Sequence, residues 1–194
     1  MATSARVITP SQTVGPFFSF CLTRHPAHLS LLANPRLATG DTPGAHVTIS
    51  GLMLDGAGAP VPDALVEVWQ ADSHGRYAGF DTADPIGSFT GFGRVECDPQ
   101  GRFVIDTVKP GRVGAPRGGL QAPHIALGIF AKGLNRRLYT RLYFDDEPSN
   151  EGDLVLASVP AARRHTLIAR GTGTGRYEFV VRLQGGDETV FLEA

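Results

Sequence analysis

Ala122-Pro-His-Ile-Ala-Leu-Gly-Ile-Phe-Ala-Lys-Gly133 is the stretch on which the interpretation of the whole chain depends. The apolar run 123–131 predicts a buried β-strand, with one imidazole, His124, at its entry and one cation, Lys132, at its exit. A buried histidine beside a loop can be a metal ligand, a base or a hydrogen-bonded core residue. The rest of the sequence has to decide between these roles.

Short apolar runs separated by glycine and proline continue on both sides of this strand. The 24 glycines and 14 prolines follow no repeat, which is typical of many short strands joined by turns. The predicted strands cover 46–55, 64–71, 92–97, 102–108, 123–131, 138–144, 165–169, 176–183 and 188–192. Residues 153–157 predict one or two helical turns with Asp153 as the cap. The chain is therefore predicted to be all-β, an antiparallel β-sandwich with little helix.

Residues 1–45 show no strand or helix periodicity, and we expect them to form an N-terminal arm ahead of a sandwich domain at 46–194. The side chains of interest in the arm are Thr13, Gly15, Pro16, Phe17, Phe18 and Phe20. Three phenylalanines are too apolar to remain in water, so the arm is expected to pack on the core or on a partner chain.

The composition excludes several classes of partner. Lysine and arginine number 18 against 19 acidic residues, for a net charge of -1, so there is no basic field to attract nucleic acid or an anionic membrane. No run approaches the ~20 apolar residues of a membrane span, and no signal peptide is evident, so we expect a soluble cytoplasmic protein. Cys21 and Cys97 belong to no metal or redox motif and are expected to be reduced thiols that pack as small apolar side chains.

Four short motifs resemble those of the intradiol ring-cleaving dioxygenases. In order they are Trp69-Gln-Ala-Asp72, Gly75-Arg-Tyr77, Lys109-Pro-Gly111 and Pro123-His-Ile125. The resemblance extends from about residue 8 to residue 192. It implies a sandwich of the transthyretin (prealbumin) type, cleavage of catechols by O2 between the two hydroxyls, and a mononuclear Fe(III) held by two tyrosines and two histidines. Phenolate oxygens and imidazoles suit ferric iron.

Only half of that ligand set is present. Tyr77 matches the first tyrosine and His124 the first histidine. The loop 112–120, where a second tyrosine is expected, has none, and Ala126 stands where the second histidine would share a strand face with His124. His74, Asp72 and His165 are alternative ligands, but a solvated role explains the two histidines more simply. We therefore expect Tyr77 and His124 to be vestigial metal-site positions in a chain that binds no metal.

One branch of the family is built from two homologous chains, of which the beta chain carries the iron and the alpha chain keeps a remnant of the site. Further stretches fit the alpha type, namely 9–16, 140–147, 166–169 and 188–191. The resemblance then implies a large hetero-oligomer with an iron-bearing beta chain, which acts on O2 and a catechol that carries a carboxylate. No nucleic acid or membrane partner is expected.

In that branch, the alpha chain's arm and a basic residue after the histidine-bearing strand line the substrate pocket of the partner. The matching substrate-binding residues are Thr13, Gly15, Pro16 and Lys132, and no catalytic residue is expected within this chain alone. The family usually has arginine at the position of Lys132, so a bidentate grip on the carboxylate becomes a single-point contact. Arg136 or Arg137 could compensate, although a solvated loop position explains both more simply.

Two other functions remain open. A non-enzymatic transthyretin-like module that binds a ligand or a protein would also lack iron ligands. A self-sufficient dioxygenase would have to combine Tyr77 and His124 with unexpected ligands.

Overall fold

The computed structural model describes residues 9–15, 18, 22, 36–79, 89–116 and 118–193. Four residues singled out in the sequence, Pro16, Phe17, Phe20 and Cys21, lie outside the described residues.

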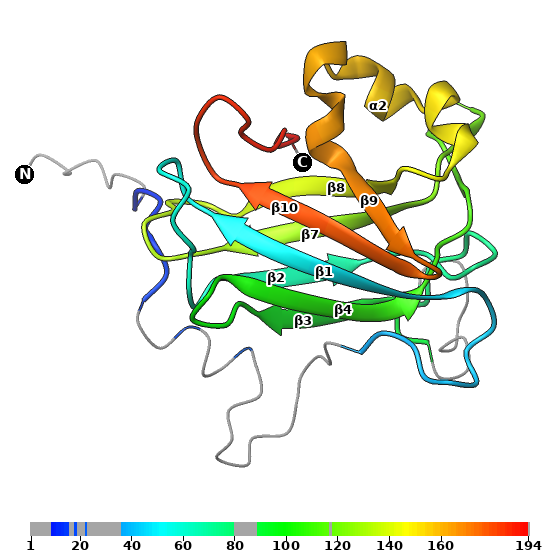
Figure 1. The fold of residues 1–194 in the computed structure, drawn as a ribbon, viewed down its shortest axis with the longest axis horizontal. Coiled ribbons are helices and arrows are strands. Elements are labelled where there is room, and N and C mark those ends of the chain that lie inside the picture. Colours follow the sequence, from blue (N-terminus) through cyan, green and yellow to red (C-terminus); the bar gives the residue numbers. More distant parts are fainter. Residues whose placement is uncertain are drawn as a thin grey trace, which may run out of the picture.

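Ten strands and three short helices make up the described part of the chain (Figure 1). The strands are β1 (His46–Leu54), β2 (Leu65–Trp69), β3 (Phe92–Glu96), β4 (Arg102–Val108), β5 (Val113–Gly114), β6 (Leu120–Gln121), β7 (His124–Phe130), β8 (Leu138–Phe144), β9 (Ile168–Gly173) and β10 (Arg176–Arg182). The helices are η1 (Pro148–Gly152), α2 (Leu154–Ser158) and η2 (Ala161–Leu167).

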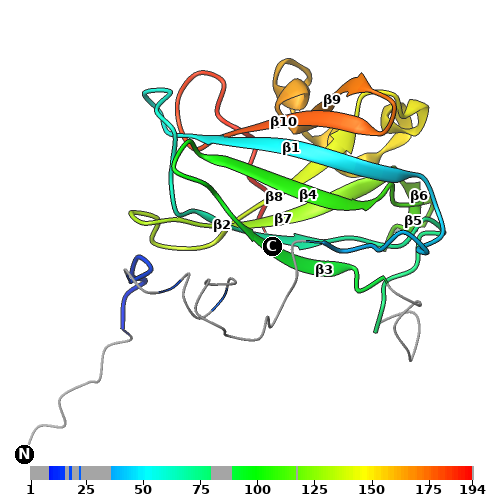
Figure 2. The same ribbon diagram turned by 60° about the horizontal axis from the view of Figure 1, so that its bottom comes forward.

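The strands form a sandwich, as expected. Their hydrogen-bonded order is β3-β2-β7-β8-β9-β10-β1-β4, and β5 pairs with β6 separately. Strands β1, β4 and β10 lie in one layer and β2, β3 and β7 in the other, as both ribbon views show (Figures 1 and 2). One feature differs from the expected antiparallel pattern, because β1 pairs with β10 and β8 pairs with β9 in parallel. Partners so far apart in sequence are not joined by a hairpin and are free to run parallel.

The core lies between the two layers. Its side chains alternate with exposed ones along β1 and β4, where Ile49, Met53 and Ile105 are fully buried. Strand β7 contributes Ile125, Leu127 and Ile129 to the same core. The period of two along a strand then places His124, Ala126 and Gly128 together on its outward face.

Several sequence predictions are confirmed to the residue. Strands are present at Arg102–Val108 and Leu138–Phe144, and Asp153 caps α2 by accepting a 2.8 Å hydrogen bond from the Leu156 amide. Cys97 is a buried free thiol, and burial raises its pKa to about 12, so it packs as an apolar side chain.

One predicted strand, 165–169, is only partly correct, and another, 188–192, is wrong. Residues 165–167 belong to the helix η2, which has Pro160 as its N-cap, and strand β9 starts only at Ile168. Residues 188–192 form no strand in the described chain. Single backbone bonds, from Thr189 to Arg182 and from Leu192 to Tyr139, hold this segment instead.

The described parts of the arm contact the sandwich near Leu37 and again near Thr13, among other places. Leu37 and Ala38 belong to the core, and the Leu37 amide donates to the Asp106 carbonyl at 3.0 Å. Near the start of the chain, the Thr13 hydroxyl accepts a 2.7 Å hydrogen bond from the Gly133 amide. None of the helices in the described ranges is long and apolar enough to cross a membrane.

Candidate functional site

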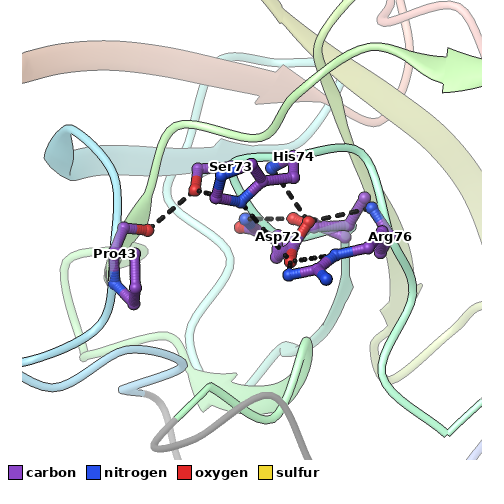
Figure 3. A network of polar contacts seen from close by, with 7 residues as sticks. Pro43, Asp72, Ser73, His74 and Arg76 are labelled. Carbon is purple, nitrogen blue, oxygen red and sulfur yellow. Dashed lines mark hydrogen bonds and ion pairs between the residues drawn. The ribbon is translucent and has the colours of Figure 1, made fainter. Parts of the chain in front are cut away.

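A buried carboxylate organises the loop that follows β2. Asp72 accepts hydrogen bonds from the amides of His74 and Arg76 through Oδ1 and a fork from the Arg76 guanidinium, at 3.0 and 2.7 Å, through Oδ2 (Figure 3). Although burial acts to raise its pKa, these hydrogen bonds and the Arg76 charge hold the pKa of Asp72 below its ordinary value. The loop is therefore ordered by its own sequence, and it presents Tyr77 directly after the last bond of the network.

Two glycines lock this loop against the segment after β4. Gly75 has φ of 78°, and a side chain there would collide with the carbonyl of Arg112. The Gly111 amide donates to the Asp72 carbonyl at 2.8 Å. The Gly75-Arg-Tyr77 and Lys109-Pro-Gly111 motifs thus serve first to dock two loops.

Tyr77 lies half-buried beside an aromatic side chain of β2. Its ring centroid is 5.3 Å from that of Trp69, with the planes inclined at 59°. Trp69 pairs with Ala126 on β7, two residues from His124. Tyr77 and His124, the two residues expected to be vestigial metal-site positions, therefore lie toward the same end of the β2–β7 pair.

His124 is a buried, neutral imidazole. Its Nδ1 lies 2.8 Å from the Ala122 carbonyl, which can only accept, so Nδ1 carries the proton and Nε2 the lone pair. Burial first, and then the positive charge of Arg141, lower its pKa from 6.5 to about 4. The ring also stacks, tilted, on Tyr143 at 5.7 Å.

The residues around His124 do not fit a ferric ion. Ala126 occupies the same strand face and offers no ligand, and its neighbour across β8 is Arg141, a cation that repels a metal. Within the described ranges there is no group of three or more histidine, cysteine, aspartate or glutamate side chains that could hold a metal.

Sequence reasoning missed a buried polar cluster behind His124. Arg141 donates from Nη1 to Gln121 at 2.6 Å, the Tyr143 hydroxyl donates to Asp153 at 3.1 Å, and Asp153 also accepts from the Ala122 amide at 2.8 Å. The available signal was an arginine at the centre of a strand, Leu138–Phe144, whose other residues apart from Thr140 are apolar or aromatic.

Thr13 and Lys132 meet at the other end of β7. The bond from Gly133 to Thr13 brings the arm next to Lys132, whose Nζ lies 3.1 Å from Asp63 Oδ2 with both side chains about half exposed. Gly15 has open space around its Cα. Seven-residue β7 separates His124 from this group by about 20 Å at ~3.3 Å per residue.

Arg137 contacts residues on the outward face of the sheet. Its guanidinium is 3.5 Å from Glu67, and its stem lies over Gly128 on the outward face of β7.

Comparisons with known proteins agree with this geometry. A family model described as Dioxygenase matches residues 15–185. The protocatechuate 3,4-dioxygenase alpha chain of Burkholderia cepacia is 44% identical over 95% of this chain and 96% of its own length. The beta chain from the same organism is 34% identical over 81% of this chain and 72% of its own length.

A solved structure shares the fold over nearly the whole chain. The dioxygenase domain of a dioxygenase carbohydrate-binding protein fusion from Streptomyces sp. SirexAA-E is 25% identical, with a TM-score of 0.60, and covers 92% of this chain and 100% of that one.

Proposed function

The chain belongs to the dioxygenase family, and we propose that it is the alpha subunit of a protocatechuate 3,4-dioxygenase. Together with a homologous beta chain it converts 3,4-dihydroxybenzoate and O2 to 3-carboxy-cis,cis-muconate. The Fe(III) belongs to the beta chain in this proposal, and this chain supplies pocket wall, charge and assembly surface. The supporting relatives include chains of both types, of which the alpha chain is the more similar at 44% against 34% identity.

One observation supports the proposal. His124 starts β7, whereas Lys132 follows the other end of that strand and Thr13 accepts a hydrogen bond from the Gly133 amide there. Thr13 and Lys132 therefore have no role at a site centred on His124, about 20 Å away. Their role is explained if they face a site that another chain completes.

Each residue of the group has a separate part in that pocket. Lys132 is a half-exposed cation that forms an ion pair with the equally exposed Asp63. Because such an exposed ion pair is weak, a substrate carboxylate can take the place of Asp63. Gly15, with no side chain, lets the substrate approach its backbone, and Thr13 ties the arm to the β7 exit. Pro16, which lies outside the described residues, is assigned to the same pocket from the resemblance alone. In this proposal, residues 1–45 form the arm that lines the partner's pocket, and residues 46–194 form the sandwich domain.

The test is co-expression with a candidate beta chain. We expect the complex, and not this chain alone, to contain iron and to consume O2 with 3,4-dihydroxybenzoate. Iron and activity in this chain alone would show a self-sufficient dioxygenase. If no beta chain forms a complex, a non-enzymatic binding module becomes the better explanation.

Lys132→Ala tests the pocket within the complex. Loss of a charge-assisted hydrogen bond is expected to raise KM for 3,4-dihydroxybenzoate about tenfold, because such bonds contribute about 1.5 kcal/mol or more. Catechol, which has no carboxylate, should show an unchanged KM. Arg170→Ala, which removes an exposed cation on β9, is the matched control. An equal effect on both substrates would contradict the assigned role of Lys132.

A further inference from the structure

The register of the β2–β7 pair places an acidic and a basic side chain opposite each other at one end. Leu65, the first residue of β2, pairs with Phe130, the last residue of β7. Because the strands are antiparallel, the residue two positions before Leu65 lies across from the residue two positions after Phe130. These residues are Asp63 and Lys132, and Lys132 Nζ lies 3.1 Å from Asp63 Oδ2.

Asp63 has an unusual backbone conformation. Its φ is 58°, and within the described ranges no other residue apart from glycine has a positive φ. Pro62 and Asp63 form a turn, and a turn position that follows proline and has a positive φ favours glycine or asparagine. An aspartate at this position is strained, and strained residues concentrate at functional sites.

The backbone on both sides of Asp63 is held by the sandwich. The Val61 amide donates to the Met53 carbonyl at 3.0 Å. On the other side, the Ala64 carbonyl accepts a 2.8 Å hydrogen bond from the Cys97 amide, and Ala64 is fully buried. The fold therefore keeps the Asp63 carboxylate at the end of β7, and the carboxylate needs no ion pair to stay there.

The stability of the chain does not explain a carboxylate at this position. Both side chains of the pair are 54% exposed, and an ion pair in such surroundings contributes little to stability. Asparagine or glycine would suit the backbone at least as well. What aspartate adds is a negative charge beside Lys132, the side chain to which the proposed function assigns the substrate carboxylate.

We propose that Asp63 is a built-in competitor for Lys132. Its carboxylate occupies the cation until a substrate carboxylate displaces it, whereas a catechol without a carboxylate displaces nothing. Asp63 is thus a positioning residue that acts through Lys132, and it limits the affinity for carboxylated substrates. This inference rests on the proposed function and deepens it.

Asp63→Asn removes the charge and keeps a residue type that tolerates a positive φ. In the complex with the beta chain, we expect this variant to lower KM for 3,4-dihydroxybenzoate about two- to fivefold, with kcat and the KM for catechol unchanged. Asp63→Gly, which also suits the turn, should have the same effect. The matched control is Glu178→Gln, which breaks an exposed ion pair between β9 and β10 and should change neither KM.

The ion pair itself can be measured on this chain without a partner. The sequence has two lysines, Lys109 and Lys132, so peptide mapping after acetylation reports on each amine. We expect Lys132 to react about twofold faster or more in Asp63→Asn, because its amine no longer has to leave an ion pair. Lys109, which is paired with Asp146, should react at an unchanged rate and serves as the internal reference.

Several results would overturn the inference. A raised KM for 3,4-dihydroxybenzoate in Asp63→Asn would show that the carboxylate holds Lys132 in place for the substrate, and an unchanged KM would show that it does not compete. Equal changes for both substrates would indicate a structural role, and unchanged acetylation of Lys132 would show that the pair does not form in solution. An unsubstituted complex without activity would instead reject the proposed function, and this inference with it.

Discussion

At the scale of single residues, His124 shows how a buried imidazole acts as a structural group. Its imidazole is buried, donates to the Ala122 carbonyl and has its pKa lowered to about 4, mainly by burial. The folded state thus binds fewer protons than the unfolded state between about pH 4 and 6.5. The neutral His124 imidazole therefore makes its full contribution to the free energy of unfolding above about pH 6.5. That contribution is lost as the pH falls toward 4.

We therefore expect the free energy of unfolding to fall by about 2 kcal/mol between about pH 7 and pH 5 because of His124. Urea unfolding at the two pH values measures the difference. His124→Gln should remove most of this dependence, whereas His165→Gln, at an exposed position of η2, should retain it. Equal pH dependence in both variants would argue against the neutral buried imidazole.

Asp153 is a second residue whose burial determines how much it contributes to the free energy of unfolding. It is fully buried and accepts bonds from the Ala122 amide, the Leu156 amide and the Tyr143 hydroxyl. Asp153→Ala is expected to lower the free energy of unfolding by about 3 kcal/mol, because it removes a helix cap and leaves buried donors unpaired.

The matched control is Asp55→Ala. Asp55 also accepts from two backbone amides, those of Ala57 and Ala59, but these bonds are exposed and water can replace them. We expect a loss of about 1 kcal/mol or less in denaturant unfolding. A similar loss at both positions would mean that burial is not the deciding factor.

At the scale of elements, local pattern was sufficient where a strand alternates or a turn is marked. Strand β4 and the cap of α2 follow from such patterns. The helix η2 does not, because its apolar residues suit a strand equally well and only packing decides between the two. The strand prediction for residues 188–192 is wrong for a related reason. The backbone of this segment forms single hydrogen bonds with β8 and β10 and not a continuous ladder.

Strand β1 contains a glycine whose role is visible only in the sheet. Gly51 pairs with Phe103 on one side and Phe179 on the other, and a side chain at Gly51 would collide with the Phe103 ring. Gly51→Val should cost about 2 kcal/mol or more in urea unfolding, because a filled core cannot accept the added volume.

Gly173→Ala is the control for that substitution. It also lies in a strand, β9, but nothing stands within 4 Å of the added Cβ. We expect its stability to be within about 0.5 kcal/mol of the unsubstituted chain. A similar loss for both variants would point to backbone conformation rather than space as the cause.

At the scale of the whole molecule, the arm joins the sandwich through a short anchor at 36–45. Leu37 and Ala38 lie in the core, and the Thr42 carbonyl lies 3.0 Å from His46 Nε2. Deleting residues 1–35 should therefore leave the sandwich folded and abolish activity with the beta chain. Deleting residues 1–45 should cost about 3 kcal/mol more in thermal or urea unfolding, because a buried leucine is lost. Equal stability of the two deletions would contradict the anchor.

The sequence by itself determined the fold class, most strand positions, the cap at Asp153 and the incomplete ligand set, because turns, alternation and residue identity are local properties. It also determined that Ala126 shares a strand face with His124. The tertiary structure alone decided that Arg141 faces Ala126, that Asp63 meets Lys132, and that Thr13 reaches the far end of β7. These relations depend on pairing between segments distant in sequence, and pairing is set by the packing of the whole core.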